Sequence, residues 1–484
     1  MELTFVGIIL IVVGTYVVLL GSVRTAIVFL VVSALFDGSA AISLPSLGGS
    51  SIPPVQFALL FTTLRILAPK GGYLGLLPTA IIENKWIVLF AIYGIASAYL
   101  APRMFAGAID VFPMHADRRL GLYGTVPLRP TAQNLTAGFY MVGALLLAIS
   151  SYIFCRIPRG GKTLANVLMI ACWIHIVTGL SDLALRGTPF EEVLSVFRNG
   201  GYVLLDHSAS GFVRIRGVLP EASTYAGIGF ALFVANMELW YRSIQTRATG
   251  LAAAVMALVL VISTSSTAYV ALLVYGVFFV LRGILFPTVA PPGKILLAAY
   301  SAAGIFFLVC ILMAVVPELP FAVYELVVDM TVGKPTSDSG QQRLFWAMQG
   351  WDGFLVSYGL GIGAGSFRSS SIFMAILGSM GFVGVITFAT YLVTVFQGSR
   401  RSTWGLGPTE LQSIGGALGT AALLSLVPAG ISSPHAVPSD LFSIMAGAAI
   451  ALRSSAAEGL ARPSKGERQF SWKEATPREE TSAA

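Results

Sequence analysis

Long uninterrupted runs of apolar residues, separated by short polar breaks, extend along almost the whole chain. Most runs approach the roughly 20 residues that a helix needs to cross a bilayer. They are continuous, whereas the strands of a membrane barrel would alternate apolar and polar residues over about ten positions. The pattern therefore predicts an all-α, polytopic bundle of transmembrane helices.

Runs of this length predict about 12–13 spans. Their expected positions are 4–21, 25–44, 55–69, 85–101, 135–155, 163–181, 223–240, 249–264, 267–286, 295–316, 371–397, 412–430 and 436–452. The second, third and last runs show the pattern least clearly, which leaves the count open. All spans belong to one expected transmembrane domain, residues 1–452.

Composition supports a membrane location and limits the partners. Apolar types make up 56% and charged types 11% of the 484 residues, whereas a soluble domain carries about 25% charged residues. A net charge of +7 is explained by short basic loops on the cytoplasmic side of a membrane. We therefore expect membrane lipids, and no nucleic acid, as partners. The four histidines are scattered, so we expect no metal site and no cofactor.

Basic residues gather in alternate loops, which predicts the orientation. These loops follow the fifth, seventh, ninth and eleventh spans and contain Arg156, Arg159, Lys162, Arg242, Arg247, Arg282, Lys294, Arg400 and Arg401. All of them can face the cytoplasm together. Segment 453–484 cannot bury a core, so we expect a disordered cytoplasmic tail.

The same alternation places three long segments on the outer face, at 102–134, 182–222 and 317–370. The third contains the stretch VPELPFAVYELVVDM, for which we expect one or two helices along the surface. Functional residues concentrate on loops that a rigid scaffold positions. The chemistry is therefore expected on this side.

The second outer segment ends in RIRGVLPEAST, directly before a predicted span. On an extended backbone Arg214 and Arg216 would point the same way, and paired guanidinium groups suit phosphate oxygens. Glu221 would lie at the first turn of the next helix, where a carboxylate is favourable. The alternative is interfacial anchoring by snorkelling arginines, with Glu221 as their salt-bridge partner.

The third outer segment contains QQRLFWAMQGW. A helix here would place Arg343 and Trp346 on one face, because they are three positions apart. Arg343 could then bind phosphate, and Trp346 or Trp351 could stack on a sugar ring. The alternative is an amphipathic interfacial helix with its tryptophans among the lipid headgroups.

A glycine-rich stretch, YGLGIGAGSFRS, follows. Its alternate glycines, Gly359, Gly361, Gly363 and Gly365, permit a tight turn and a close backbone approach to a ligand. Arg368 at its end could contact an anionic group or a lipid headgroup. The GxGxxG-like string has no strand–helix unit around it, which argues against a dinucleotide site.

Other polar residues lie at or near the ends of predicted spans. The run Ser263–Thr267 fits a tight hairpin between two helices. His435, in SSPHAVPSD, could assist proton transfer from an acceptor hydroxyl, although an isolated loop histidine is often incidental. Few charges, such as Asp37 and Arg65, fall within spans, which makes an ion-coupled transporter less attractive.

The order and spacing of these motifs resemble the O-antigen ligase and polymerase superfamily, polytopic glycosyltransferases of bacterial surface polysaccharides. The matching elements are RIRGVLPEAST before a span, STSSTAYVALLVYG two spans later, and a long loop closing with QQRLFWAMQGW, YGLGIGAGSF and ILGSMGFVGVITF. They cover about residues 200–400, and the first 200 residues match only in being apolar helices.

The resemblance implies a GT-C-like architecture in the bacterial inner membrane and a polyprenyl-pyrophosphate-linked glycan as substrate. An acceptor hydroxyl would attack the anomeric carbon, and the lipid pyrophosphate would leave. By resemblance, Arg214 or Arg216 matches the family arginine before the central span, and Arg343 matches the one in the long loop. They would stabilise charge developing on the pyrophosphate. A flippase and a chain-length regulator are the partner proteins implied.

One departure bears on the type of enzyme. Ligases of this superfamily typically carry a histidine soon after the glycine-rich turn, whereas this chain reads SFRSSSIFMAILG there. This favours a polymerase of exopolysaccharide or O-antigen. An O-antigen ligase that transfers finished glycan, and a lipid or polysaccharide transporter or flippase, are the alternatives. The acceptor-activating base stays open, with Glu221 and His435 as candidates.

Overall fold

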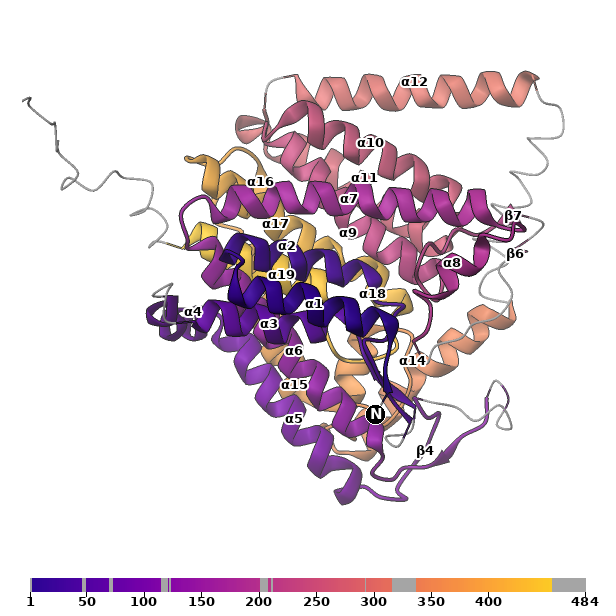
Figure 1. The fold of residues 1–484 in the computed structure, drawn as a ribbon. Coiled ribbons are helices and arrows are strands. Elements are labelled where there is room, and N and C mark those ends of the chain that lie inside the picture. Colours follow the sequence, from indigo (N-terminus) through magenta and orange to yellow (C-terminus); the bar gives the residue numbers. More distant parts are fainter. Residues whose placement is uncertain are drawn as a thin grey trace, which may run out of the picture.

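The computed structural model describes residues 2–45, 49–68, 73–114, 121, 123–200, 208–209, 212–291, 293–315 and 337–454. Long helices run side by side between two ends of one bundle (Figure 1). The surface helices expected at VPELPFAVYELVVDM and nearly all of the expected tail lie outside the described residues.

A helix forms at every predicted span, although the second, expected at 25–44, is helical only as far as Phe36 and its last residues, Ile42–Leu44, form a strand. These helices are α1 (Phe5–Leu19), α2 (Val23–Ser33), α3 (Pro54–Leu67), α5 (Lys85–Met104), α6 (Ala132–Cys155), α7 (Gly160–Leu185), α9 (Ala222–Tyr241), α10 (Thr246–Ile262), α11 (Ser266–Leu285), α12 (Lys294–Val315), α15 (Ile372–Phe396), α17 (Glu410–Leu424) with α18 (Leu426–Ser432), and α19 (Asp440–Arg453). Within the described residues, six helical segments are long and apolar enough to cross a membrane: α5, α6, α7, α11, α15 and α17–α18. The chain is therefore a mostly helical protein with membrane character, and the count of about 12–13 spans stays a prediction.

Short elements connect the long helices. The helical ones are η1 (Ala34–Phe36), η4 (Tyr73–Leu76), α4 (Leu77–Glu83), α8 (Glu191–Ser195), η6 (Pro287–Val289), α14 (Asp338–Val356) and α16 (Arg401–Trp404). Three small antiparallel sheets pair β1 (Glu2–Leu3) with β2 (Ile42–Leu44) and β3 (Ser50–Ile52), β4 (Asp110–Val111) with β5 (Val126–Pro127), and β6 (Ser208–Ala209) with β7 (Phe212–Val213).

The last predicted span, α19, forms the centre of the core. Every side chain from Leu441 to Arg453 is buried, and the helix packs against α6 and α17. Its small residues explain this position, because alanine and glycine let helix backbones approach closely. At Gly447, for example, an added Cβ would lie 2.1 Å from the Ala148 carbonyl oxygen of α6.

The two ends of the bundle differ in character (Figure 1). One end carries α8, the β6–β7 and β4–β5 pairs and α14, and we call it the loop end. The opposite end carries α4, α16 and the turn between α6 and α7. All three predicted outer segments contribute to the loop end, so they do share one end of the molecule.

Two of the residues used as orientation signals do not lie in exposed loops. Arg242 and Arg282 are buried, and both form ion pairs with Glu238 inside the bundle. The Tyr275 hydroxyl also donates to Glu238, at 2.8 Å. These arginines neutralise a buried carboxylate, so their charge does not report on the side of the membrane.

The predicted hairpin and glycine turn both form. α10 ends at Ile262 and α11 begins at Ser266, which confirms the tight connection. The glycine-rich stretch has positive φ at all four alternate glycines. Its backbone approaches other helices closely: a Cβ added at Gly361 would lie 2.4 Å from the Ser379 backbone, and one at Gly365 would lie 2.4 Å from the Gln133 carbonyl oxygen.

Candidate functional site

A cavity of about 380 Å³ lies at the loop end, between α14, the residues after the glycine-rich turn and the start of α9. We call it the arginine cavity. Its lining includes five of the predicted site residues, Glu221, Arg343, Trp346, Arg368 and His435. Its volume falls within the range of about 300–1,000 Å³ that is usual for small-ligand sites. Residues far apart in the sequence therefore meet around one space.

Arg343 enters the cavity from α14. The predicted helix is present, and Arg343 and Trp346 both line the cavity, in agreement with their spacing. The Arg343 guanidinium donates to the Ile431 carbonyl at 3.3 Å, and the Ser370 hydroxyl donates to the Arg343 carbonyl at 2.6 Å. The first contact connects α14 to α18, and the second connects it to the segment that carries Arg368.

Three arginines and one carboxylate form a single electrostatic group. Burial lowers the pKa of Arg343, the Glu221 carboxylate opposes this shift, and Arg368 adds to it. Burial also lowers the pKa of Arg214, where the Arg343 charge adds to the shift and Glu221 opposes it. Guanidinium groups stay charged despite such shifts. The group therefore carries an excess of positive charge, which suits a multivalent anion.

The two predicted tryptophans have different surroundings. The Arg368 guanidinium carbon lies 4.6 Å from the centre of the Trp346 ring, and Phe112 packs on the same ring at 5.4 Å. The Trp346 ring thus supports Arg368 through a cation–π contact. Trp351 is 43% exposed and packs on Phe354. It does not line the cavity, so the expected sugar-stacking surface does not include both rings.

Glu221 precedes the first turn of α9 and is its N-cap residue. The Ser223 hydroxyl donates to the Glu221 carboxylate at 2.7 Å, and this fixes the side chain beside the cavity. A carboxylate at a helix N-terminus is stabilised by the helix dipole. Glu221 also lies close enough to Arg214 and Arg343 to influence both charges.

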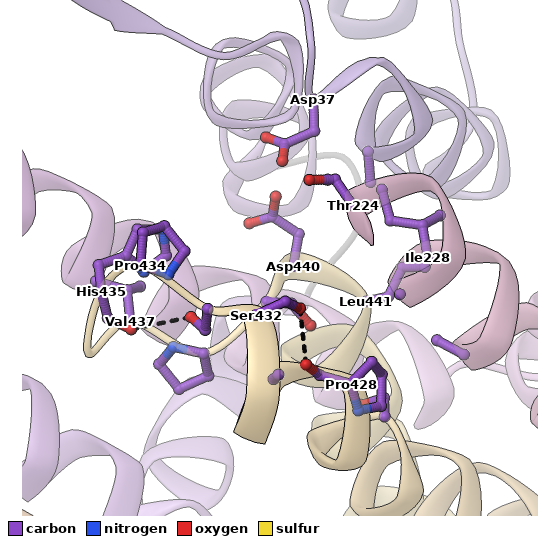
Figure 2. A pocket seen from close by; sticks show the side chains of 18 of the residues that line it. Asp37, Thr224, Ile228, Pro428, Ser432, Pro434, His435, Val437, Asp440 and Leu441 are labelled. Carbon is purple, nitrogen blue, oxygen red and sulfur yellow. Dashed lines mark hydrogen bonds between the residues drawn. The ribbon is translucent and has the colours of Figure 1, made fainter. Parts of the chain in front are cut away.

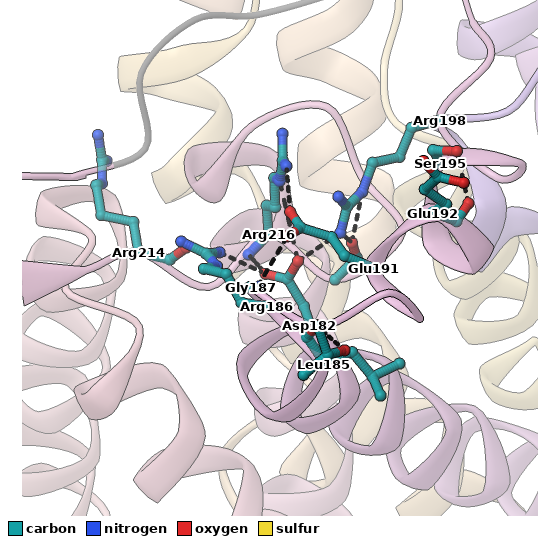
Figure 3. A network of polar contacts seen from close by, with 12 residues as sticks. Asp182, Leu185, Arg186, Gly187, Glu191, Glu192, Ser195, Arg198, Arg214 and Arg216 are labelled. Carbon is teal, nitrogen blue, oxygen red and sulfur yellow. Dashed lines mark hydrogen bonds and ion pairs between the residues drawn. The ribbon is translucent and has the colours of Figure 1, made fainter.

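Asp182, near the end of α7, organises the segment that carries Arg214 and Arg216 (Figure 3). Its carboxylate is 1% exposed and forms ion pairs with Arg186 and Arg198. It also accepts the Arg216 backbone N–H at 3.0 Å. Arg186 in turn donates to the Arg214 carbonyl at 3.0 Å. One buried carboxylate thus holds the backbone on both sides of residue 215.

The same network separates the roles of the two arginines. The Arg216 guanidinium lies 3.9 Å from both Asp182 and Glu191, and Figure 3 shows it above these carboxylates with Arg214 to one side. Arg214 is influenced instead by Arg343 and Glu221. The sequence predicts one paired phosphate site at these residues. The structure assigns Arg216 to the Asp182 network and Arg214 to the vicinity of the arginine cavity.

His435 lies in the loop before α19 and contributes to the cavity wall. Burial lowers the pKa of His435. Hydrogen bonds with the backbone of Val437 and of His435 itself oppose this shift, and the Arg368 charge adds to it. The imidazole is therefore neutral near pH 7 and able to accept a proton.

A second cavity, of about 210 Å³, adjoins the first. We call it the carboxyl cavity, because Asp37 and Asp440 point toward each other across it (Figure 2). The Gln56 amide donates to the Asp440 carboxylate at 3.3 Å. From the sequence, Asp37 was predicted only as one of the few charged residues within spans, and Asp440 was not among the predicted site residues. Both could have been found from their positions, because each is an ionisable residue in a predicted span, and such residues are commonly functional.

In the part of the chain that the structure describes, no three His, Cys, Asp or Glu side chains gather as metal ligands. The arrangement can bind an anion through its arginines and exchange a proton through His435, Asp37 or Asp440.

Comparison with known proteins adds no assignment to this chemistry. No protein-family model and no curated protein matches the chain.

Proposed function

We propose that this protein is a membrane glycosyltransferase that polymerises polyprenyl-pyrophosphate-linked oligosaccharide repeat units into exopolysaccharide or O-antigen. The proposal places it in the bacterial inner membrane as a multi-pass, GT-C-like protein. Its loop end faces outward, and the opposite end, which carries α4 and α16, faces the cytoplasm. A flippase would supply the substrate, and a chain-length regulator would set the length of the polymer.

The observation that carries the proposal is the arginine cavity. Arg343 and Arg368 come from separate segments and line one space at the end of an apolar bundle, with Arg214 close enough for the Arg343 charge to lower its pKa. Arginine forks match phosphate oxygens by paired hydrogen bonds. A pyrophosphate attached to a lipid would bring several negative charges to this point while its chain stays among apolar helices.

The reaction needs stabilisation of a leaving group. An acceptor hydroxyl attacks the anomeric carbon, a new glycosidic C–O bond forms, and the bond from that carbon to the pyrophosphate oxygen breaks. Negative charge grows on the departing pyrophosphate, and fixed cations in a partly buried cavity stabilise it. Arg343, Arg368 and Arg214 are the residues to which we assign this role.

The test is glycan analysis of a deletion strain complemented with variants. Single repeat units on their lipid carrier should accumulate when the gene is absent. Arg343→Ala and Arg368→Ala should fail to restore polymer at normal protein levels. Arg129→Ala is the matched control, because Arg129 is exposed and lies in a loop segment outside both cavities.

Two results would redirect the assignment. Full-length lipid-linked polymer in the deletion strain would indicate a ligase. Unchanged polymer length and amount in both arginine variants would contradict the catalytic proposal. A transporter or flippase would then be the better assignment.

A further inference from the structure

The carboxyl cavity and the arginine cavity are parts of one space. Asp37, Tyr140, Thr224, Ser432 and His435 line both. A molecule held by Arg343 and Arg368 would therefore lie next to the wall that contains Asp37. The two cavities supply different chemistry, since one presents cations and the other presents carboxyl oxygens.

Asp37 is directed at this space by the fold. It follows η1 at the end of α2, and its side chain is exposed to the cavity. In the described part of the chain, no hydrogen bond or ion pair occupies its carboxylate. The Asp37 carboxylate is therefore positioned to contact a molecule that occupies the shared space.

Asp440 completes a pair. It is the first residue of α19, after the N-cap Ser439, and its carboxylate faces that of Asp37 (Figure 2). The Gln56 amide holds one Asp440 oxygen at 3.3 Å. Two carboxyl groups at short range resist double ionisation, so they tend to share one proton. Such a pair can take a proton at one oxygen and release it from another.

We propose that the Asp37–Asp440 pair accepts the proton of the acceptor hydroxyl during glycosyl transfer. Asp37 contacts the acceptor, and the Asp440 carboxylate on α19 sets the proton affinity of Asp37. The O–H bond of the acceptor breaks as its oxygen forms the glycosidic bond, and the proton passes to the Asp37 carboxylate. The pyrophosphate leaves with the electron pair of the broken C–O bond, and the proton then returns to water. This inference rests on the proposed function.

The arrangement separates binding from proton transfer. The arginines hold the pyrophosphate, and the carboxyl pair lies on the wall shared by the two cavities. Loss of a carboxylate should therefore reduce turnover and leave affinity for the lipid pyrophosphate intact. Loss of an arginine should reduce affinity itself.

The experiment uses the purified full chain with lipid-linked repeat units extracted from the deletion strain. Farnesyl pyrophosphate serves as a binding probe. Asp37→Asn and Asp440→Asn should lower the polymerisation rate by about 100-fold or more, the usual contribution of general base catalysis, with the Kd for the probe changed by less than about threefold. Asp37→Glu should retain more activity than Asp37→Asn. Asp110→Asn, an exposed aspartate on β4, is the control and should leave both quantities unchanged.

The outcomes distinguish a failure of the carboxyl-pair inference from a failure of the proposed function. If the wild-type chain polymerises the extract and both Asn variants do so at the same rate, the carboxyl pair has no role in proton transfer. If the Asn variants lose probe binding as well, the pair contributes to binding or folding, and the inference is wrong. If the wild-type chain neither binds the probe nor uses the extract, the proposed function itself fails.

Discussion

Arg343 and Arg368 reach the arginine cavity in different ways, and this gives each a distinct dependence on its neighbours. Arg343 is held by the Ile431 carbonyl, whereas the Arg368 guanidinium lies over Trp346. The Arg343 contact uses one guanidinium nitrogen, and the Arg368 contact places the central guanidinium carbon over the indole ring. The planar fork, and not charge alone, is therefore the property that matters at these positions.

Arg343→Lys tests the importance of the fork. Lysine keeps the positive charge but offers one ammonium in place of parallel donors, so we expect affinity for farnesyl pyrophosphate to fall by about tenfold, which corresponds to about 1.4 kcal/mol. Titration of the purified variant measures this. Arg129→Lys should bind as the wild type does. Equal affinity of Arg343→Lys and the wild type would contradict a forked phosphate contact.

His435 should make stability sensitive to acid. Burial lowers the pKa of His435 in the folded protein, whereas the unfolded chain titrates near the ordinary value of about 6.5. The unfolded state therefore binds more protons as the pH falls through about 6.5, and the free energy of unfolding decreases. Thermal unfolding of the wild type between about pH 5 and 7.5 should show this decrease, and His435→Gln should show a smaller one. Parallel curves for the two proteins would contradict a neutral, buried imidazole.

At the scale of elements, the loop between α7 and α9 is held by a buried carboxylate as well as by the packing of Ile215 and Leu219 in the core. Asp182 contacts Arg186, Arg198 and the backbone of Arg216. The segment between these arginines includes residues that the structure does not describe. Arg198 and Arg216, at its described ends, both contact this side chain, so the position of Arg214 depends on it.

Asp182→Asn should disturb both stability and activity. The change removes a buried negative charge and leaves the Arg186 and Arg198 guanidinium groups uncompensated, and breaking a buried pair in this way costs about 3–5 kcal/mol. We expect a lower unfolding temperature in detergent and a loss of polymer in cells. Glu192→Gln, at an exposed position of α8, is the control. An Asp182→Asn protein as stable and active as this control would show that the network does not position Arg214.

For the molecule as a whole, the two ends of the bundle should contact opposite sides of a membrane. Thr188 is exposed at the loop end, and Lys162 is exposed at the opposite end. In a Cys310→Ser background, an impermeant maleimide should label Thr188→Cys in intact cells. It should label Lys162→Cys only after the membrane is permeabilised. The reverse pattern would place the arginine cavity in the cytoplasm and exclude a reaction on the outer face.

Much of the fold could be predicted because helix formation in an apolar solvent is a local requirement. Each long apolar run must pair its own backbone groups, so every predicted span became a helix. The helix around Arg343 was also predictable, since spacing along one helix decides which side chains share a face. Burial was less predictable. Arg242 and Arg282 were predicted to be charged loop residues, but both lie in the core. Their ion pairs with Glu238 form only when the helices pack together.

The apolar pattern by itself determined that this chain is a helical membrane-type protein and where its helices lie, because those properties depend on neighbouring residues. The polar motifs between the apolar runs also indicated Arg343, Arg368 and Glu221 as candidate functional residues. Only the tertiary structure decided that they share a cavity, that Arg216 belongs with Asp182, and that Asp37 faces Asp440. These relations join residues from different helices, and their geometry follows from how helices pack rather than from order along the chain.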